Sequence, residues 1–157
     1  MAVVADPQGA LLSLLEARGG DPLDTAEADI GGFLWNELWT SDVDAATRFY
    51  QGIADYAIED RAVAAEHNYR LLKVEDVARV GILANPIEGL SPLWATYIRV
   101  ADDAALDAMV GRVESLGGNV LLEPQDRAIG GRVALIADPS GAGIAIQTWP
   151  EFGPDEE

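Results

Sequence analysis

The sequence predicts an α+β domain in which the order strand, helix, strand, strand, strand occurs twice. The first copy covers residues 33–84 and the second covers 94–149, with a linker that contains proline and glycine at 85–92. A chain of 157 residues, of which 49% are hydrophobic, can build one core of ordinary size. An internal repeat of this length determines the fold class more than any single motif, so we expect two βαβββ halves within residues 33–150.

The first half begins with a strand rich in aromatic residues. Residues 33–40 read Phe-Leu-Trp-Asn-Glu-Leu-Trp-Thr, a composition typical of strands. Ser41 and Asp42 follow as helix-capping residues, and apolar side chains at helical spacing predict a helix over 42–54. Three further strands are expected at 56–65, 69–74 and 80–84.

The second half repeats this order. Residues 94–100 predict a strand, and Asp102 and Asp103 can cap the helix that follows. Apolar side chains at helical spacing continue to Leu116, where Gly117-Gly118 ends the helix. Three further strands are expected at 119–122, 131–138 and 143–149.

The N-terminal residues contain a second repeat. The segment 2–10, Ala-Val-Val-Ala-Asp-Pro-Gln-Gly-Ala, closely matches 134–142, Ala-Leu-Ile-Ala-Asp-Pro-Ser-Gly-Ala, 132 residues later. Asp-Pro-x-Gly is a turn signal, because proline fixes φ and glycine accepts a left-handed conformation. We therefore expect residues 1–18 to form a hairpin that resembles the end of a preceding, absent domain. A linker at 19–32 and an acidic tail at 151–157 complete the predicted organisation.

The apolar side chains of this hairpin predict self-association. Burying one leucine or valine side chain is worth roughly 1.5–3 kcal/mol, and an isolated two-stranded hairpin is marginally stable. Because its own domain is absent, we expect the hairpin to dock on a second copy of the chain, which predicts a homodimer. The apolar residues concerned are Val3, Val4, Leu11, Leu12, Leu14 and Leu15.

Charge and composition exclude several classes of function. The chain carries 27 acidic and 10 basic residues, a net charge of −17, and such a field repels nucleic-acid backbones and anionic membrane surfaces. It has no cysteine, which excludes disulfides and thiolate chemistry. The first residues lack the features of a secretory signal, and no apolar run approaches the ~20 residues that cross a bilayer. These observations predict a cytoplasmic protein.

Four segments, taken in order and spacing, resemble the vicinal-oxygen-chelate (VOC) superfamily, which contains glyoxalase I, bleomycin-resistance proteins and extradiol dioxygenases. The segments are Trp35-Asn36-Glu37-Leu38, then Ser41-Asp42 with Phe49-Tyr50, then Leu116-Gly117-Gly118, and last Gly131-Arg132-Val133-Ala134 with Asp138-Pro139-Ser140-Gly141-Ala142. The resemblance is to the C-terminal domain of tandem members. It implies a cupped eight-stranded mixed sheet with the helices outside and a ligand cavity inside.

The resemblance also implies where a metal would be held. Metal-using members place His, Gln or Glu at inward positions of the first, fourth, fifth and eighth strands. Aligned on the motifs, these positions are Trp35 in the first strand, Ala95 in the fifth and Ala145 in the eighth, while the motifs assign no residue in the fourth. None of these side chains binds a divalent cation, and the single histidine, His67, lies outside the pattern. We therefore expect no metal and no other cofactor.

Strand alternation indicates which side chains line the cup. Leu38 and Ile98 are 60 residues apart, and we expect both to face the helices. The residues that alternate with them along their strands, which are mostly aromatic or polar, then face inward. Matching Leu34-Trp35 with Leu93-Trp94 gives an offset of 59 instead, which inverts the faces of the second half. We favour 60, because the other choice turns Arg99 toward the helix. The candidate ligand-binding residues are then Phe33, Trp35, Trp39, Tyr97, Arg99 and Gln147.

Three functions fit this pattern, and we favour the first. It is metal-free binding of a small aromatic or amphipathic molecule in the cup, without catalysis. The second is a metal-independent lyase or isomerase with Glu37 as general base and Arg99 or Tyr97 stabilising an oxyanion. Against that role, Glu37 and Arg99 could form a structural ion pair. The third is an assembly module without a ligand.

Overall fold

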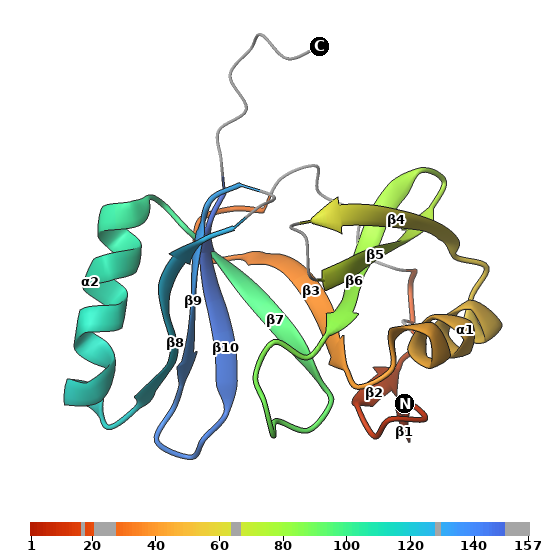
Figure 1. The fold of residues 1–157 in the computed structure, drawn as a ribbon, viewed down its shortest axis with the longest axis horizontal. Helices are drawn as coiled ribbons and strands as arrows, with labels where there is room; N and C mark the ends of the chain where they lie inside the picture. Colours follow the sequence, from red (N-terminus) through yellow and green to blue (C-terminus); the bar gives the residue numbers. More distant parts are fainter. Residues whose placement is uncertain (17, 21–27, 64–66, 128–129, 150–157) are drawn as a thin grey trace, which may run out of the picture. The chain divides into compact units, whose positions relative to one another are not determined.

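The computed structural model describes residues 1–16, 18–20, 28–63, 67–127 and 130–149. The predicted acidic tail at 151–157 and residues 21–27 of the predicted linker lie outside the described residues. The elements in chain order (Figure 1) are β1 (Ala2–Ala5), β2 (Leu11–Leu14), β3 (Phe33–Thr40), α1 (Val43–Ile53), β4 (Ala57–Val63), β5 (His67–Val74), β6 (Val77–Ala84), β7 (Leu93–Val100), α2 (Asp103–Val113), the 3₁₀ turn η1 (Glu114–Leu116), β8 (Asn119–Asp126), β9 (Arg132–Ala137) and β10 (Gly143–Thr148).

Eight strands form one mixed sheet in the order β4-β5-β6-β3-β7-β10-β9-β8, and β1 and β2 form a separate hairpin. In each half the first strand lies parallel to the last, β3 with β6 and β7 with β10. A parallel pair needs a long crossover, which the helix and the two intervening strands supply. The structure confirms the predicted α+β class and the mixed eight-stranded sheet.

Two strands extend at least three residues beyond the ranges that the sequence predicts. β6 begins at Val77 rather than at residue 80, and β8 continues to Asp126 rather than ending at residue 122. β8 is the last strand in the sheet order, so no strand of the described residues pairs with its far edge. The polar stretch Glu123 to Asp126 obscures the strand pattern, although polar residues are common on edge strands.

Contacts between Cα atoms divide the chain into two compact units. The first unit comprises Met1–Ala26 and Trp35–Ala95, and the second comprises Glu27–Leu34 and Thr96–Glu157. No helix in the described part of the chain is long and apolar enough to cross a membrane.

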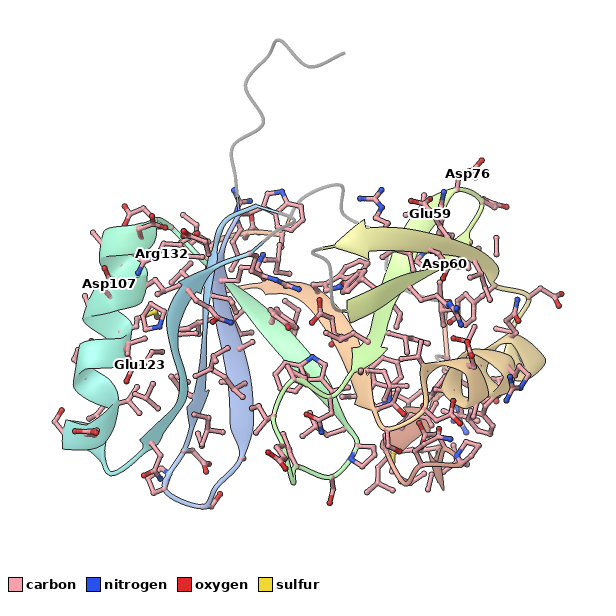
Figure 2. All side chains as sticks on the ribbon, viewed as in Figure 1. Glu59, Asp60, Asp76, Asp107, Glu123 and Arg132 are labelled. Atoms are coloured by element: carbon pink, nitrogen blue, oxygen red, sulfur yellow. The ribbon has the colours of Figure 1, made fainter. Side chains whose placement is uncertain are left out.

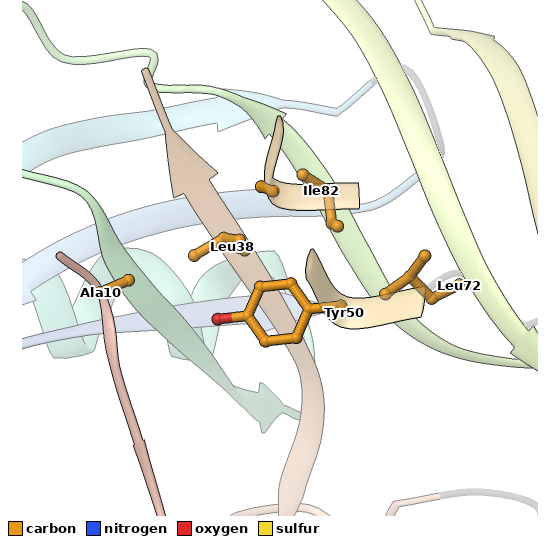
Figure 3. Packing of buried hydrophobic residues seen from close by; sticks show 6 residues of the cluster. Ala10, Leu38, Tyr50, Leu72 and Ile82 are labelled. Atoms are coloured by element: carbon orange, nitrogen blue, oxygen red, sulfur yellow. The ribbon is translucent and has the colours of Figure 1, made fainter. Parts of the chain in front are cut away.

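In the first unit, α1 packs on the sheet through its apolar side. The helix begins after Asp42, whose carboxylate accepts a hydrogen bond from the backbone N–H of Ala45 at 2.9 Å, as an N-cap residue does. Its buried face meets the side chains of β3, β5 and β6 (Figure 3). The buried cluster consists of Ala10, Leu38, Ala46, Tyr50, Leu72 and Ile82.

The N-terminal hairpin packs one face against this same cluster of its own unit, while its expected docking on a second copy stays a prediction. Ala10 is 1% exposed within the cluster, and Leu12 packs beside it. The Tyr50 hydroxyl of α1 donates a hydrogen bond of 3.2 Å to Oδ2 of the buried Asp6. From the sequence, all the apolar side chains of the hairpin are expected to be buried together by docking. The structure divides them, because strand pairing directs Leu12 inward while Leu11 stays exposed.

The two Asp-Pro-x-Gly segments form the same turn, as the repeat predicts. Asp6 N–H donates to the carbonyl of Ala10 at 2.9 Å, and Asp138 N–H donates to that of Ala142 at 3.0 Å. In both turns the aspartate Oδ1 accepts from the backbone N–H groups two and four residues later, at distances of 2.8–2.9 Å. The glycine has a positive φ in each case, +99° and +92°.

The second unit has its own core between α2 and the sheet. The buried residues are Val100, Leu106, Val110, Ala134 and Ile146. Ile98 packs against this cluster from β7, so Ile98 and Val100 face α2 and Tyr97 and Arg99 lie on the opposite face. This arrangement agrees with the offset of 60 and disagrees with 59. Asp102 caps α2 by accepting from the Ala105 N–H at 2.7 Å.

Several basic side chains are paired with exposed acids, and Figure 2 labels one such pair, Arg132 and Asp107. Arg70 contacts Asp44 and Asp60 at 2.8 and 2.7 Å, and Arg132 contacts Asp107 on α2 at 3.2 Å. These pairs hold the pKa of Asp44 below its usual value and raise the pKa of both arginines, chiefly through the hydrogen bonds. Pairs whose acidic partner is exposed to solvent stabilise a fold only weakly, typically by about 0–1 kcal/mol each.

Candidate functional site

The first unit contains a buried cluster of polar and aromatic side chains around Glu37. Trp35, Glu37 and Trp39 alternate along β3, so their side chains share the face of the strand away from Leu38 and α1. Tyr69 reaches the cluster from β5. Glu37, Trp39 and Tyr69 are at most 4% exposed, and Trp35 is half-buried.

Hydrogen bonds join these four side chains into one network. The Tyr69 hydroxyl donates to Oε1 of Glu37 at 2.7 Å, and the Trp39 indole Nε1–H donates to Oε2 at 3.2 Å. The Trp35 indole N–H in turn donates to the Tyr69 hydroxyl oxygen at 2.9 Å. A buried carboxylate is tolerated when donors of this kind replace water.

Gly81 provides the space for this network. It lies on β6 in register with Glu37, and a Cβ atom at this position would collide with the Tyr69 hydroxyl. Neither Tyr69 nor Gly81 was identified from the sequence. The available signal was a glycine inside an apolar strand, which often marks a close approach of another group.

The geometry gives Glu37 the features of a structural residue. Each carboxylate oxygen accepts a hydrogen bond from a neighbouring side chain, and the residue is 0% exposed. A general base needs a lone pair within hydrogen-bond reach of the substrate proton. The arrangement therefore supports a packing and positioning role for Glu37 more than the catalytic role considered from the sequence.

The second unit contains a different polar cluster, centred on Gln147 of β10. Gln147 is 0% exposed, and its Oε1 accepts a hydrogen bond of 2.8 Å from Nη1 of Arg127. The Arg127 guanidinium carbon lies 5.0 Å from the ring centre of Tyr97, within cation–π distance. Arg127 was not identified from the sequence, because it follows the predicted end of its strand. Among the described residues, Nε2 of Gln147 has no hydrogen-bond acceptor.

The other two predicted binding residues lie at the margins of the second unit. Arg99 is in register with Gln147 on the neighbouring strand β7, and its Nη1 donates to the carbonyl of Ala28 at 2.6 Å. Phe33 is 74% exposed. The structure thus groups Tyr97 and Gln147 with Arg127, groups Trp35 and Trp39 around Glu37, and leaves Phe33 at the surface.

A sequence profile of the Glyoxalase/Bleomycin resistance protein/Dioxygenase superfamily matches residues 32–146, which is most of the chain. The chain belongs to this superfamily. The described VOC fold agrees with solved structures of other members. Methylmalonyl-CoA epimerase from Mycobacterium tuberculosis superposes with a TM-score of 0.55 at 20% identity, over 82% of this chain and 94% of that one. Catechol 2,3-dioxygenase superposes with a TM-score of 0.56 at 16% identity, over 99% of this chain and 56% of that one.

Curated relatives are more similar in sequence. The protein named "Putative glyoxylase CFP32" of Mycobacterium tuberculosis (strain CDC 1551 / Oshkosh) is 35% identical over 93% of this chain and 54% of its own length. The anthracycline biosynthesis protein DnrV of Streptomyces peucetius is 32% identical over 74% of this chain and 46% of its own length. The chain thus spans about half the length of the curated relatives it matches.

The register of the VOC domain assigns the metal-ligand position that the motifs left open. In the second half, Ala145 of β10 is in register with Tyr97 of β7. In the first half, Gly81 of β6 is in register with Glu37 of β3. Because Tyr97 is the counterpart of Glu37 at the offset of 60, Gly81 is the counterpart of Ala145 and occupies the fourth-strand position.

The four positions where metal-using VOC members place ligands do not fit a metal here. The side chains at these positions are the indole of Trp35, the hydrogen atom of Gly81 and the methyl groups of Ala95 and Ala145. In the first unit the Tyr69 hydroxyl fills the space against Gly81, and it accepts a hydrogen bond from the Trp35 indole. Across the described ranges, no group of three or more His, Asp or Glu side chains could hold a metal ion.

Proposed function

We propose that this VOC domain is a cytoplasmic, metal-free binding domain that holds a small aromatic or amphipathic molecule against the sheet face opposite the helices. The observation that carries the proposal is the set of residues at the four metal-ligand positions, which are Trp35, Gly81, Ala95 and Ala145. A domain of this superfamily that retains the fold without those ligands keeps an inner face suited to binding. Small-molecule sites combine apolar walls with a few oriented polar groups, and both clusters have this composition.

A metal titration tests the first part of the proposal. We expect Ni²⁺, Zn²⁺ and Mn²⁺ to leave the melting temperature of the chain unchanged within error, compared with the same chain in a chelator. His67→Ala is the control, because the chain has one histidine and no cysteine. A micromolar metal affinity that persists in His67→Ala would contradict the proposal, since the metal would then be held elsewhere in the domain.

A ligand titration tests the second part. We expect the neutral aromatic amide 2-naphthamide, the anion 2-naphthoate, or both, to bind with heat detectable by calorimetry. Tyr97→Leu, in the unit that contains Gln147, should weaken binding about fivefold, which corresponds to ~1 kcal/mol for one aromatic contact. Trp94→Leu is the matched control, because Trp94 packs in the cluster on the α1 side and lies 5.4 Å from the Tyr50 ring. Absence of binding for both probes would remove the proposed function.

We also propose that the domain self-associates through the outer face of the N-terminal hairpin. This face differs from the inward face that packs on α1, and its side chains have no such cover among the described residues. The exposed apolar residues of the segment are Met1, Val3, Leu11, Leu14 and Leu15.

A further inference from the structure

The Gln147 side chain carries a buried hydrogen-bond donor that calls for an acceptor. Its neighbours in β10 point toward α2, since Ile146 packs in the α2 core and Thr148 Oγ1 donates to Asp103 at the start of that helix, at 3.2 Å. By strand alternation, the Gln147 side chain lies on the opposite face of the sheet. This is the face that carries Tyr97 and Ala145 in the same unit.

The orientation of the Gln147 amide follows from its partner. A guanidinium group has donors and no acceptor, so the atom that Arg127 contacts at 2.8 Å must be the amide oxygen. The NH₂ group is then the other terminal atom, with two N–H donors. Among the described residues it has no acceptor, and the residue is 0% exposed. Buried donors without partners are rare in folded proteins, and each one calls for an explanation such as a bound ligand or water.

Two basic residues lie beside this amide. Arg127 bonds to it directly and lies over the Tyr97 ring, and Arg99 is its neighbour in register on β7. These are two of only 10 basic residues in a chain of net charge −17. The field of such a chain repels anions, so a neutral ligand would need no local cation, whereas an anionic ligand would.

We propose that Gln147 and Arg127 bind the carboxylate of the domain's ligand, which makes that ligand a small aromatic carboxylic acid. The Gln147 Nε2–H donates to one carboxylate oxygen, and the guanidinium of Arg127 compensates the negative charge. This inference rests on the proposed binding function and adds the chemical class of the ligand. A charge-assisted hydrogen bond contributes more than a neutral one, so the acid should be preferred over its amide.

The test compares 2-naphthoate with 2-naphthamide, which share one ring system and differ in charge. With the full 157-residue chain at pH 7, calorimetry should give an affinity for naphthoate at least about tenfold higher than for naphthamide. Gln147→Glu keeps an oxygen acceptor for Arg127 and replaces the NH₂ donor with an acidic oxygen. We expect it to reduce the naphthoate affinity about tenfold or more and to leave that of naphthamide within threefold.

Two further variants keep the test decisive. Gln51→Glu makes the same change of charge at an exposed position of α1 and should leave both affinities unchanged. Gln147→Met removes both polar atoms at similar size, and it should also abolish the preference for the acid if Gln147→Glu fails to fold. Equal binding of acid and amide by the wild-type chain would overturn this inference and leave the proposed function standing. A preference for the acid that survives both Gln147 variants would overturn it as well, and binding of neither probe would instead remove the proposed function.

Discussion

Glu37 is a buried acidic residue with two hydrogen-bond partners in its own unit, Trp39 and Tyr69. Trp39 flanks it on the same strand, while Tyr69 belongs to a strand beyond β6 in the sheet order. The sequence placed Glu37 and Trp39 on one face through the two-residue period of a strand. It could not place Tyr69 or Gly81, because those contacts depend on which strands are neighbours and in what register. The period of a strand shows which side chains share a face, whereas the hydrogen-bond partners of those side chains depend on which strands pair.

The network predicts a stability role for the Glu37 carboxylate. Glu37→Gln keeps one oxygen for Tyr69 but presents an NH₂ group to the Trp39 indole N–H, so two donors face each other. We expect the free energy of unfolding in urea to fall by about 1–3 kcal/mol. Glu123→Gln, at an exposed position of β8, should change it by less than about 0.5 kcal/mol.

Binding measurements on the same variant separate the two roles of Glu37. If Glu37 is structural, naphthoate and naphthamide affinities measured well below the melting temperature should stay within a few-fold of wild type. A variant with wild-type stability that loses turnover of any substrate would instead support the general-base role.

Tyr50 predicts a loss of stability at alkaline pH. Burial, followed by the nearby Asp6 carboxylate, raises the pKa of the Tyr50 hydroxyl well above its ordinary value of 10.0. The protonated form is therefore favoured in the folded state. Its contribution to stability is fully present below about pH 10 and decreases as the pH rises above that value, where the unfolded chain loses the proton first.

Tyr50→Phe should flatten this dependence. We expect the variant to be less stable than wild type by about 1 kcal/mol at pH 7, because Asp6 loses a hydrogen bond, and to lose less stability between pH 9 and 11. Urea unfolding followed by circular dichroism at a series of pH values measures both effects. Asp6→Asn should flatten the curve only in part, since burial of the hydroxyl remains. Parallel curves for wild type and Tyr50→Phe would contradict the assignment.

At the scale of elements, the turn repeat was the most accurate sequence prediction, because a turn depends on four adjacent residues. The packing of the hairpin on α1 was not predicted, because it depends on Tyr50, which is 44 residues away from Asp6 in the sequence. The offset between the halves was also predictable, since placing Arg99 against the helix core would have left a buried charge. Between two possible registers, a strand adopts the one that avoids burying a charged side chain against an apolar core.

Two glycine substitutions separate the effect of a positive φ from the effect of adding a side chain. Gly141 has φ +92° and open space where a Cβ atom would stand, so Gly141→Ala should destabilise the fold by about 1 kcal/mol through backbone strain. Gly111 in α2 also has open space but no positive φ, and Gly111→Ala should stabilise the fold by about 0.5–1 kcal/mol. Thermal unfolding of both variants against wild type measures the two signs. Equal effects at the two positions would contradict this account.

At the scale of the whole molecule, charge and the exposed apolar residues of the hairpin act in opposite directions on self-association. The net charge of −17 makes copies repel one another. Leu11 and Leu15 are 66% and 73% exposed, and burying such a side chain is worth roughly 1.5–3 kcal/mol. Added salt screens the repulsion without weakening the apolar contact, so self-association should strengthen as the salt concentration rises.

We therefore expect a dimer at micromolar concentration in light scattering coupled to size exclusion, with a larger dimer fraction at high salt. The double variant Leu11→Gln with Leu15→Gln should be monomeric, because it removes apolar area without changing the charge. The double variant Leu116→Gln with Leu121→Gln is the matched control in the second unit, and Leu116 is 66% exposed like Leu11. It should remain dimeric. A wild-type chain that stays monomeric at every salt concentration would show that packing of the hairpin on α1 suffices for its stability, and that its outer leucines remain in solvent.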